Sequence, residues 1–151
     1  MIGRAAIRNL WMGALFGVLF LQPGAPRTSR LSYEGVFAGV SPDGSGCLWT
    51  GSVTGAARGG LTLEIRQVEG PEDAARPVWH VVTHWSVRDS IGGRSFEAEL
   101  EGMVNWRTGA AQLEGSITSG WMEGAWVEQD GRVRNGDVSG SLEITREVAE
   151  R

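Results

Sequence analysis

The sequence predicts an all-β protein: one small antiparallel meander of about eight strands, which we expect to close into an up-and-down β-barrel. Three observations predict this fold. No stretch beyond the N-terminal segment keeps helical periodicity for three turns. Short runs of alternating apolar and polar residues are separated by clusters rich in turn-forming residues. Glycine contributes 23 residues to the chain and recurs inside those runs at equivalent positions.

The N-terminal segment differs in kind from the rest of the chain. Arg4 and Arg8 precede an apolar run from Leu10 to Leu21, which is the order of a secretory signal peptide. The run is shorter than the roughly 20 apolar residues that a membrane-spanning helix needs. We therefore expect residues 1–25 to direct export, to the periplasm or out of the cell. The alternative is that these residues form an uncleaved hydrophobic anchor. In either case, we expect residues 27–151 to form a single barrel domain that has no membrane span of its own.

The composition narrows the classes of partner. The chain contains no lysine, and its 14 basic residues are all arginine. Removing Arg4 and Arg8 leaves 12 arginines against 18 acidic residues, so the barrel domain carries a charge near −6. That balance argues against a nucleic-acid partner or an anionic membrane surface. The absence of lysine favours a bacterial source with a GC-rich genome, and the single cysteine, Cys47, rules out an internal disulfide.

The strands are predicted from alternation and the turns from their residue types. We expect strands at residues 31–40, 46–55, 60–68, 77–89, 95–106, 110–118, 121–129 and 137–146. The turns between them are predicted at Pro42-Asp43-Gly44, Ala57 to Gly59, Gly92-Gly93, Thr108-Gly109, Ser119-Gly120 and Asp130-Gly131. With an even number of strands the last lies antiparallel to the first, so closure leaves no free edge. A two-sheet β-sandwich is the alternative.

The hairpin around Gly92-Gly93 is the clearest element. If these glycines form a two-residue turn, Trp85 lies opposite Leu100 and Trp79 lies opposite Trp106 on an apolar face. The other face is polar and carries glutamates. A slip of one residue would turn those glutamates into the core, so we expect burial to enforce this register.

A pattern of apolar residue, any residue, glycine, any residue, apolar residue recurs in six predicted strands. Its glycines are Gly35, Gly51, Gly102, Gly115, Gly124 and Gly140. Because strand side chains alternate between faces, each glycine shares the inner face with its apolar flanks. The predicted turns set Gly102 opposite Gly115, and Gly115 opposite Gly124. Such a row of glycines would let the sheet coil as sharply as a closed barrel requires.

The tryptophans near these glycines form the candidate site. A barrel of about eight strands can hold one small ligand, and aromatic rings around a glycine waist could line such a pocket. The same rings could instead fill the core. The candidate lining residues are Tyr33, Trp49, Trp79, Thr83, Trp85, Trp106 and Trp126.

The residue types that catalysis or metal binding requires are missing from the expected interior. His80 and His84, the only histidines, would lie about 13 Å apart along one strand, too far for a single ion. The segment from Asp130 to Asp137 lacks the spacing of a calcium loop. The sequence contains no serine-histidine-acid arrangement with its usual context and no phosphate-binding glycine loop. We therefore expect no catalytic residue, metal or cofactor.

Three functions are compatible with the predicted fold and candidate residues. The first, which we favour, is a non-catalytic exported barrel that binds a small apolar or aromatic ligand. The second is a structural or protein-interaction domain with a filled core, using an outward patch of Val82, Met103, Trp121 and Val127. The third is a shape-directed cyclase or isomerase with Tyr33 and Thr83 as its polar groups. Lipocalins and avidins illustrate the first use of an eight-stranded barrel, and allene oxide cyclases and dirigent proteins the third, by analogy of fold alone.

Overall fold

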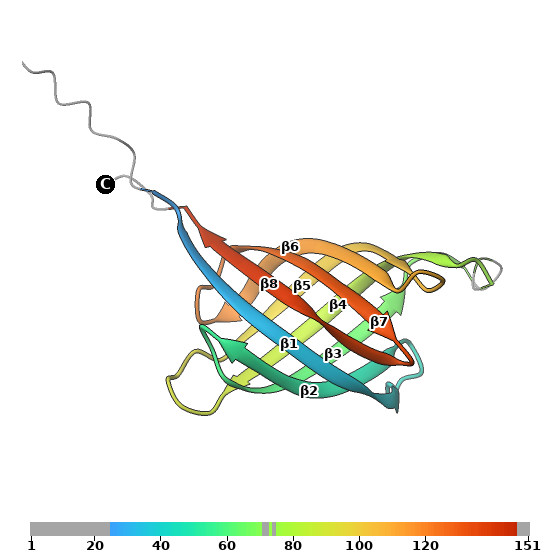
Figure 1. The fold of residues 1–151 in the computed structure, drawn as a ribbon, viewed down its shortest axis with the longest axis horizontal. Coiled ribbons are helices and arrows are strands. Elements are labelled where there is room, and N and C mark those ends of the chain that lie inside the picture. The colour runs from blue at the N-terminus through green and yellow to red at the C-terminus, as the bar shows by residue number, and fades with distance from the viewer. Residues whose placement is uncertain (1–24, 71–72, 74, 148–151) are drawn as a thin grey trace, which may run out of the picture.

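Eight antiparallel strands form a closed barrel in the computed structural model, which describes residues 25–70, 73 and 75–147 (Figure 1). The strands are β1 (Arg27–Val40), β2 (Cys47–Gly55), β3 (Gly59–Gln67), β4 (Val78–Asp89), β5 (Phe96–Asn105), β6 (Ala110–Gly120), β7 (Trp126–Arg134) and β8 (Asp137–Arg146). Each strand pairs with its neighbours in sequence, and β1 also pairs with β8. The predicted up-and-down barrel is thus confirmed, and the sheet is a barrel rather than a sandwich. No helix in the described residues is long and apolar enough to span a membrane.

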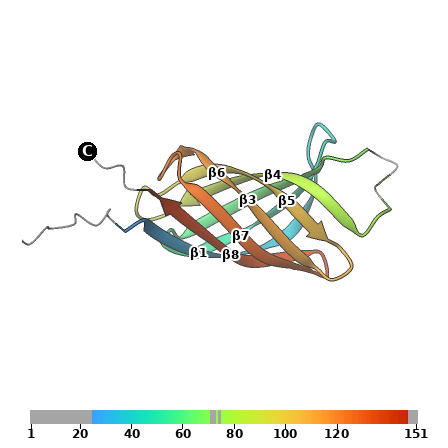
Figure 2. The same cartoon turned by 90° about the horizontal axis from the view of Figure 1, so that it is seen from above.

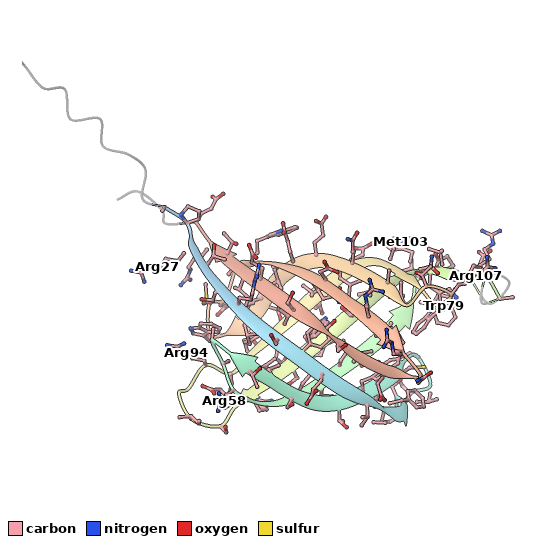
Figure 3. All side chains as sticks on the ribbon, in the orientation of Figure 1. Arg27, Arg58, Trp79, Arg94, Met103 and Arg107 are labelled. Carbon is pink, nitrogen blue, oxygen red and sulfur yellow. The ribbon has the colours of Figure 1, made fainter. Side chains whose placement is uncertain are left out.

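The two ends of the barrel carry different connections. In a meander, successive connections lie at opposite ends. The terminal end carries the start of β1, the end of β8 and the connections β2–β3, β4–β5 and β6–β7. The distal end carries the connections β1–β2, β3–β4, β5–β6 and β7–β8. The strands cross between these ends at a slant to the long axis, as Figure 2 shows from above. In Figure 3, Arg58 and Arg94 mark the terminal end, while Trp79 and Arg107 mark the distal end.

The interior is one continuous core, and the alternation of the strands explains it. On β4 the side chains of Val81, Thr83, Trp85 and Val87 are buried, whereas Val82 between them is exposed. All eight strands contribute buried side chains to a single cluster. The charged residues that alternate with them stay outside, since an unpaired charge is costly to bury.

The β4–β5 hairpin has the predicted faces but not the predicted register. Trp85 pairs with Ala98 rather than Leu100, and Trp79 pairs with Val104 rather than Trp106. The connection is a six-residue loop over residues 90–95 instead of a two-residue turn. A shift of two residues keeps every side chain on its face, so burial cannot distinguish the two registers.

The carboxylate of Asp89 explains why this loop is long. It accepts hydrogen bonds from the backbone N–H groups of Arg94 and Gly92, each at 2.9 Å. The Asp89 N–H in turn donates to Ser95 Oγ at 2.9 Å. The backbone hydrogen bonds to this carboxylate, of which the one from Arg94 has the largest effect, hold the pKa of the Asp89 carboxyl below its ordinary value. The loop is therefore organised by a side chain, which glycine-turn rules do not include.

The position of β7 is the second correction. Residues 121–125, predicted to begin this strand, form a turn in which Met122 and Gly124 have positive φ angles of 56° and 82°. The strand begins at Trp126 and runs through the predicted Asp130-Gly131 turn to Arg134. Its faces are therefore the reverse of the prediction: Trp126 points outward, and Val127 is fully buried. This phase keeps the charged residues at alternate positions of β7 in water.

The glycines do not form one row across the strands, and only some of them meet in pairs. Gly35 pairs with Gly51, and Gly131 pairs with Gly140. The predicted pairing of Gly102 with Gly115 is wrong, because these residues lie opposite Leu113 and Leu100. The predicted partner of Gly115, Gly124, lies in the β6–β7 turn and not in a strand. The glycines still serve close strand approach, since a Cβ on Gly51, Gly102 or Gly115 would collide with the backbone of a neighbouring strand.

Candidate functional site

Three of the predicted lining residues lie in the middle of the barrel and contact one another. Trp85 Nε1 donates to Thr83 Oγ1 at 2.8 Å, and that hydroxyl donates to the Leu100 carbonyl at 3.0 Å. The rings of Trp85 and Tyr33 meet edge to face with centroids 4.9 Å apart. All three candidates are buried. They form a packed layer in which the polar side-chain atoms of Trp85 and Thr83 bond to each other, while Tyr33 contributes its ring.

Tyr33 is also tied to β7. Gln129 Nε2 donates to the Tyr33 hydroxyl at 2.6 Å, a contact between two buried side chains. Burial raises the pKa of Tyr33 to about 12, so its hydroxyl is protonated at neutral pH. A phenol in this state is a poor proton acceptor, and the Thr83 hydroxyl already donates and accepts a hydrogen bond. Neither residue has the properties of a general base.

Three further candidates, Trp49, Trp79 and Trp106, lie at the distal end, where they help to line an open apolar cup of about 230 Å³. Its walls are the side chains of Phe37, Cys47, Trp49, Ile65, Trp79 and Trp106, which come from β1 to β4 and from the turn after β5. The sequence prediction included the three tryptophans. It missed the other three residues because it selected large aromatic residues with inward side chains. The sequence alone did not show which strand ends meet at one rim of the barrel.

Trp49 is held rigidly at this cup. It is buried, and its Nε1 donates to the carbonyl of Gly136 in the β7–β8 turn at 2.7 Å. Phe37 lies against it edge to face, with centroids 5.4 Å apart, and remains 52% exposed. Asn135 and Gly136 form the two-residue turn with positive φ angles that tight hairpins require, which fixes the accepting carbonyl. One wall of the cup is thus preformed.

Trp79 and Trp106 form the opposite wall. Their rings meet edge to face, with centroids 5.2 Å apart and planes at 72°. Both residues are partly exposed. The Trp106 backbone N–H donates to the Pro77 carbonyl at 2.7 Å, and the side chain of Asn105 accepts two backbone hydrogen bonds from the turn that follows. This wall therefore stands on a defined turn.

The terminal end is closed by side chains. The Arg94 guanidinium lies 5.4 Å from the centre of the Trp121 ring and donates to the Ala56 carbonyl at 2.7 Å. Trp121 packs in turn on Phe96, with centroids 6.1 Å apart. The apolar cup lies at the opposite, distal end.

Trp126, the remaining candidate, does not belong to the cup. It is 46% exposed and lies on the outer surface of β7. The outward patch of Val82, Met103, Trp121 and Val127 is also not formed, because Val127 is buried and Trp121 packs against the core. The reversed phase of β7 accounts for the misplacement of both Trp126 and Val127.

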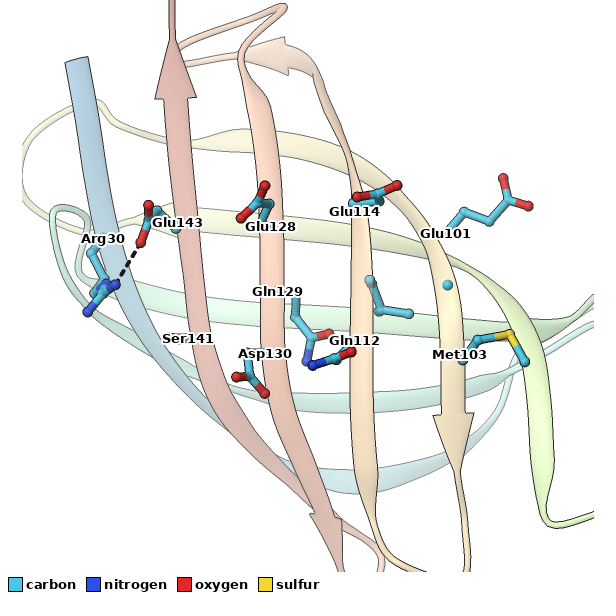
Figure 4. Close-up of a pocket in the computed structure, with 12 residues that line it drawn as sticks. Arg30, Glu101, Met103, Gln112, Glu114, Glu128, Gln129, Asp130, Ser141 and Glu143 are labelled. Carbon is cyan, nitrogen blue, oxygen red and sulfur yellow. Dashed lines mark hydrogen bonds and ion pairs between the residues drawn. The ribbon is translucent and has the colours of Figure 1, made fainter. Parts of the chain in front are cut away.

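The outer surface of β5 to β8 carries a row of like charges that the sequence analysis missed. Glu101 lies opposite Glu114, Glu114 opposite Glu128, and Glu128 opposite Glu143. They border a shallow groove of about 590 Å³ (Figure 4). Arg30 contacts Glu143 at 2.6 Å at one end of the row, and His80 contacts Glu101 at 2.6 Å at the other. His84 instead approaches Glu97 at 3.5 Å.

No group of three or more histidine, cysteine, aspartate or glutamate side chains in the described part of the chain is placed to hold a metal ion. The glutamates of the row lie on successive strands, where directly opposed side chains repel one another.

No protein-family model, curated protein sequence or solved structure matches this chain. The candidate site therefore rests on the geometry of the barrel and on the chemistry of its own residues.

Proposed function

We propose that this protein is an exported β-barrel that binds one small apolar or aromatic ligand, without catalysis, in the cup at its distal end. The observation that carries the proposal is the cup itself: three tryptophans, a phenylalanine, an isoleucine and a cysteine around a volume of about 230 Å³. Export rests on the order of charges and apolar residues at the N-terminus, a segment that lies outside the described residues.

The size of the cup sets the size of the ligand. A cavity of about 150 Å³ lined by apolar side chains accommodates one benzene molecule. The cup is somewhat larger and open on one side, so a ligand of one or two rings fits, with part of its surface left in water. Aromatic walls suit a planar ligand because rings pack edge to face or offset against other rings.

The packed middle of the barrel supports binding over catalysis. The polar groups that a shape-directed cyclase or isomerase would use belong to Tyr33 and Thr83, and both lie in hydrogen bonds within the core. Neither residue borders the cup. The cup walls supply shape and apolar surface but no ionisable acid or base other than the thiol of Cys47.

Titration with a panel of one- and two-ring compounds tests the proposal through two signals. Intrinsic fluorescence should change saturably, because three tryptophans border the cup. Compounds that bind should also slow the alkylation of Cys47 by N-ethylmaleimide, since this thiol lines the same space. A protein that stays folded and gives no change in either signal across the panel would contradict ligand binding. It would favour the alternative of a structural or protein-interaction domain.

A matched pair of variants separates the cup from the surface beside it. Phe37 and Val36 are adjacent on β1 and similarly exposed, at 52% and 57%, but only Phe37 borders the cup. Phe37→Ser should weaken binding by about tenfold, the effect of losing part of one buried aromatic contact. Val36→Ser should leave binding unchanged. Equal losses in the two variants would place the ligand elsewhere.

A further inference from the structure

Two donors beside the cup lack hydrogen-bond acceptors. The Nε1 atoms of Trp79 and Trp106 are shielded from solvent, and neither has a partner among the described residues. Trp49 and Trp85, by contrast, donate to Gly136 and Thr83. The unmet donors are therefore confined to the pair of rings that forms one wall of the cup.

This arrangement calls for an explanation, because buried donors in folded proteins are almost always paired. Burying an N–H group without an acceptor removes its hydrogen bond to water and replaces it with nothing. Here two indole N–H groups lack an acceptor, and they belong to rings that contact each other with centroids 5.2 Å apart. Both side chains are partly exposed and border the cup. Because their Nε1 atoms are shielded, one of the rings must turn for its N–H group to reach a molecule bound there.

The charge of the surrounding side chains restricts the acceptor. The six residues that line the cup are four aromatic residues, an isoleucine and a cysteine, and none of them is basic. A carboxylate or phosphate bound there would lose its hydration without gaining a cationic partner, which is costly. A neutral oxygen, such as that of a ketone, ester or ether, loses much less on leaving water.

We propose that the ligand of the cup is a neutral ring compound that carries a hydrogen-bond acceptor, and that Trp79 and Trp106 recognise this acceptor through their indole N–H groups. The inference rests on the proposed function and adds the chemical class of the ligand. Apolar contact gives the affinity, and the two donors select among compounds of equal size.

A matched pair of ligands tests the recognition of an acceptor. Indane and 1-indanone share one carbon skeleton, and only 1-indanone carries a carbonyl oxygen. The measured quantity is the ratio of their dissociation constants, indane over 1-indanone, in the wild-type protein and in each variant. Comparing this ratio between proteins cancels the different hydration of the two ligands.

Trp79→Phe and Trp106→Phe keep an aromatic ring and remove the donor. We expect the ratio to fall by about 3- to 10-fold in at least one of these variants, the range for one hydrogen bond. Trp126→Phe is the control, since this residue lies on the outer surface and should leave the ratio unchanged. A ratio that is the same in all four proteins overturns the inference while leaving the apolar ligand site intact.

A measurement on the wild-type protein keeps the test independent of how well the variants fold. In a ¹H–¹⁵N spectrum, 1-indanone should move the indole proton signals of Trp79 or Trp106 downfield, and indane should not. Signals that respond alike to the two ligands contradict recognition of the carbonyl. Failure of the wild-type protein to bind either ligand contradicts the proposed function together with this inference.

Discussion

Trp85 and Thr83, two positions apart on β4, are joined by a hydrogen bond from the indole Nε1 to Oγ1 that is closed off from water in the centre of the barrel. The Thr83 hydroxyl in turn donates a hydrogen bond to the Leu100 carbonyl on β5. One hydroxyl thus satisfies both the only polar atom of a buried tryptophan side chain and a strand carbonyl. This explains why a threonine occupies an otherwise apolar inward face.

Replacing Thr83 by valine should destabilise the barrel although the shape of the side chain is kept. The substitution leaves the buried Trp85 N–H without an acceptor, which costs about 1–3 kcal/mol. Urea unfolding followed by circular dichroism measures the change. Thr62→Val on β3 is the matched control, because Thr62 is exposed and its hydroxyl faces solvent. An equal effect of both substitutions would mean that strand propensity, and not the hydrogen bond, sets the loss.

The glycines predict a contrast between two positions on adjacent strands. A Cβ on Gly51 would lie 2.5 Å from the Gly35 Cα and would overlap the Glu34 carbonyl, whereas a Cβ on Gly60 would meet nothing within 4 Å. Gly51→Ala should therefore lower stability by more than about 2 kcal/mol or prevent folding, since two backbones must separate. Gly60→Ala should be neutral or raise stability by about 0.4–1 kcal/mol, because it restricts the unfolded chain. Thermal melts of the two variants give the comparison, and similar melting temperatures would contradict the close approach of β1 and β2.

The sequence predicted the architecture because local alternation and turn residues determine it. It did not predict the register of β4 and β5, because a shift of two residues preserves both faces, and the deciding contacts involve the side chain of Asp89. It misplaced β7 because Met122, Gly124 and Trp126 fit the repeat of apolar residue, glycine and apolar residue, which puts Trp126 on the inner face. Their true positions depend on a turn at Met122 with a positive φ angle, which is uncommon outside glycine.

The candidate site was predicted in part for the same reasons. Trp49, Trp79 and Trp106 come from distant parts of the sequence, and closure of the barrel brings them to one rim. Tyr33 and Trp85 pack in the middle of the barrel, away from these three tryptophans. This difference depends on the position of each residue along the barrel axis, which is set by the stagger of the strands. Alternation gives the face of a residue but not its height in the barrel.

The glutamate row predicts that removing one charge stabilises the fold. Glu128 lies directly between Glu114 and Glu143, and within the described chain it has no ion pair of its own. Glu128→Gln should raise stability by about 0.5 kcal/mol at low salt, because like charges directly opposite each other are destabilising. The gain should shrink as salt screens the row. Glu34→Gln is the control, since Glu34 lies opposite Ser52 and Ser139. A gain of the same size there, or one that does not depend on salt, would point to a cause other than repulsion.

Tyr33 predicts a loss of stability in strong alkali. Its pKa is raised to about 12 in the folded protein by burial, against about 10 in an unfolded chain. Because the folded state holds this proton more tightly, the associated stability is fully present below about pH 10. It is lost progressively as the pH rises towards and through 12, and amounts to about 2–3 kcal/mol.

The single tyrosine of the chain makes this loss directly observable. Tyrosinate absorbance reports Tyr33 alone, so in the folded protein it should appear only well above pH 10, and at the same pH at which unfolding begins. Tyr33→Phe should be less stable at neutral pH, since Gln129 loses its acceptor, but its stability should fall less steeply between pH 10 and 12. Ionisation at the ordinary pKa in protein that remains folded would show that water reaches the ring, and hence that the middle of the barrel is not the dry, packed layer on which the distal cup rests.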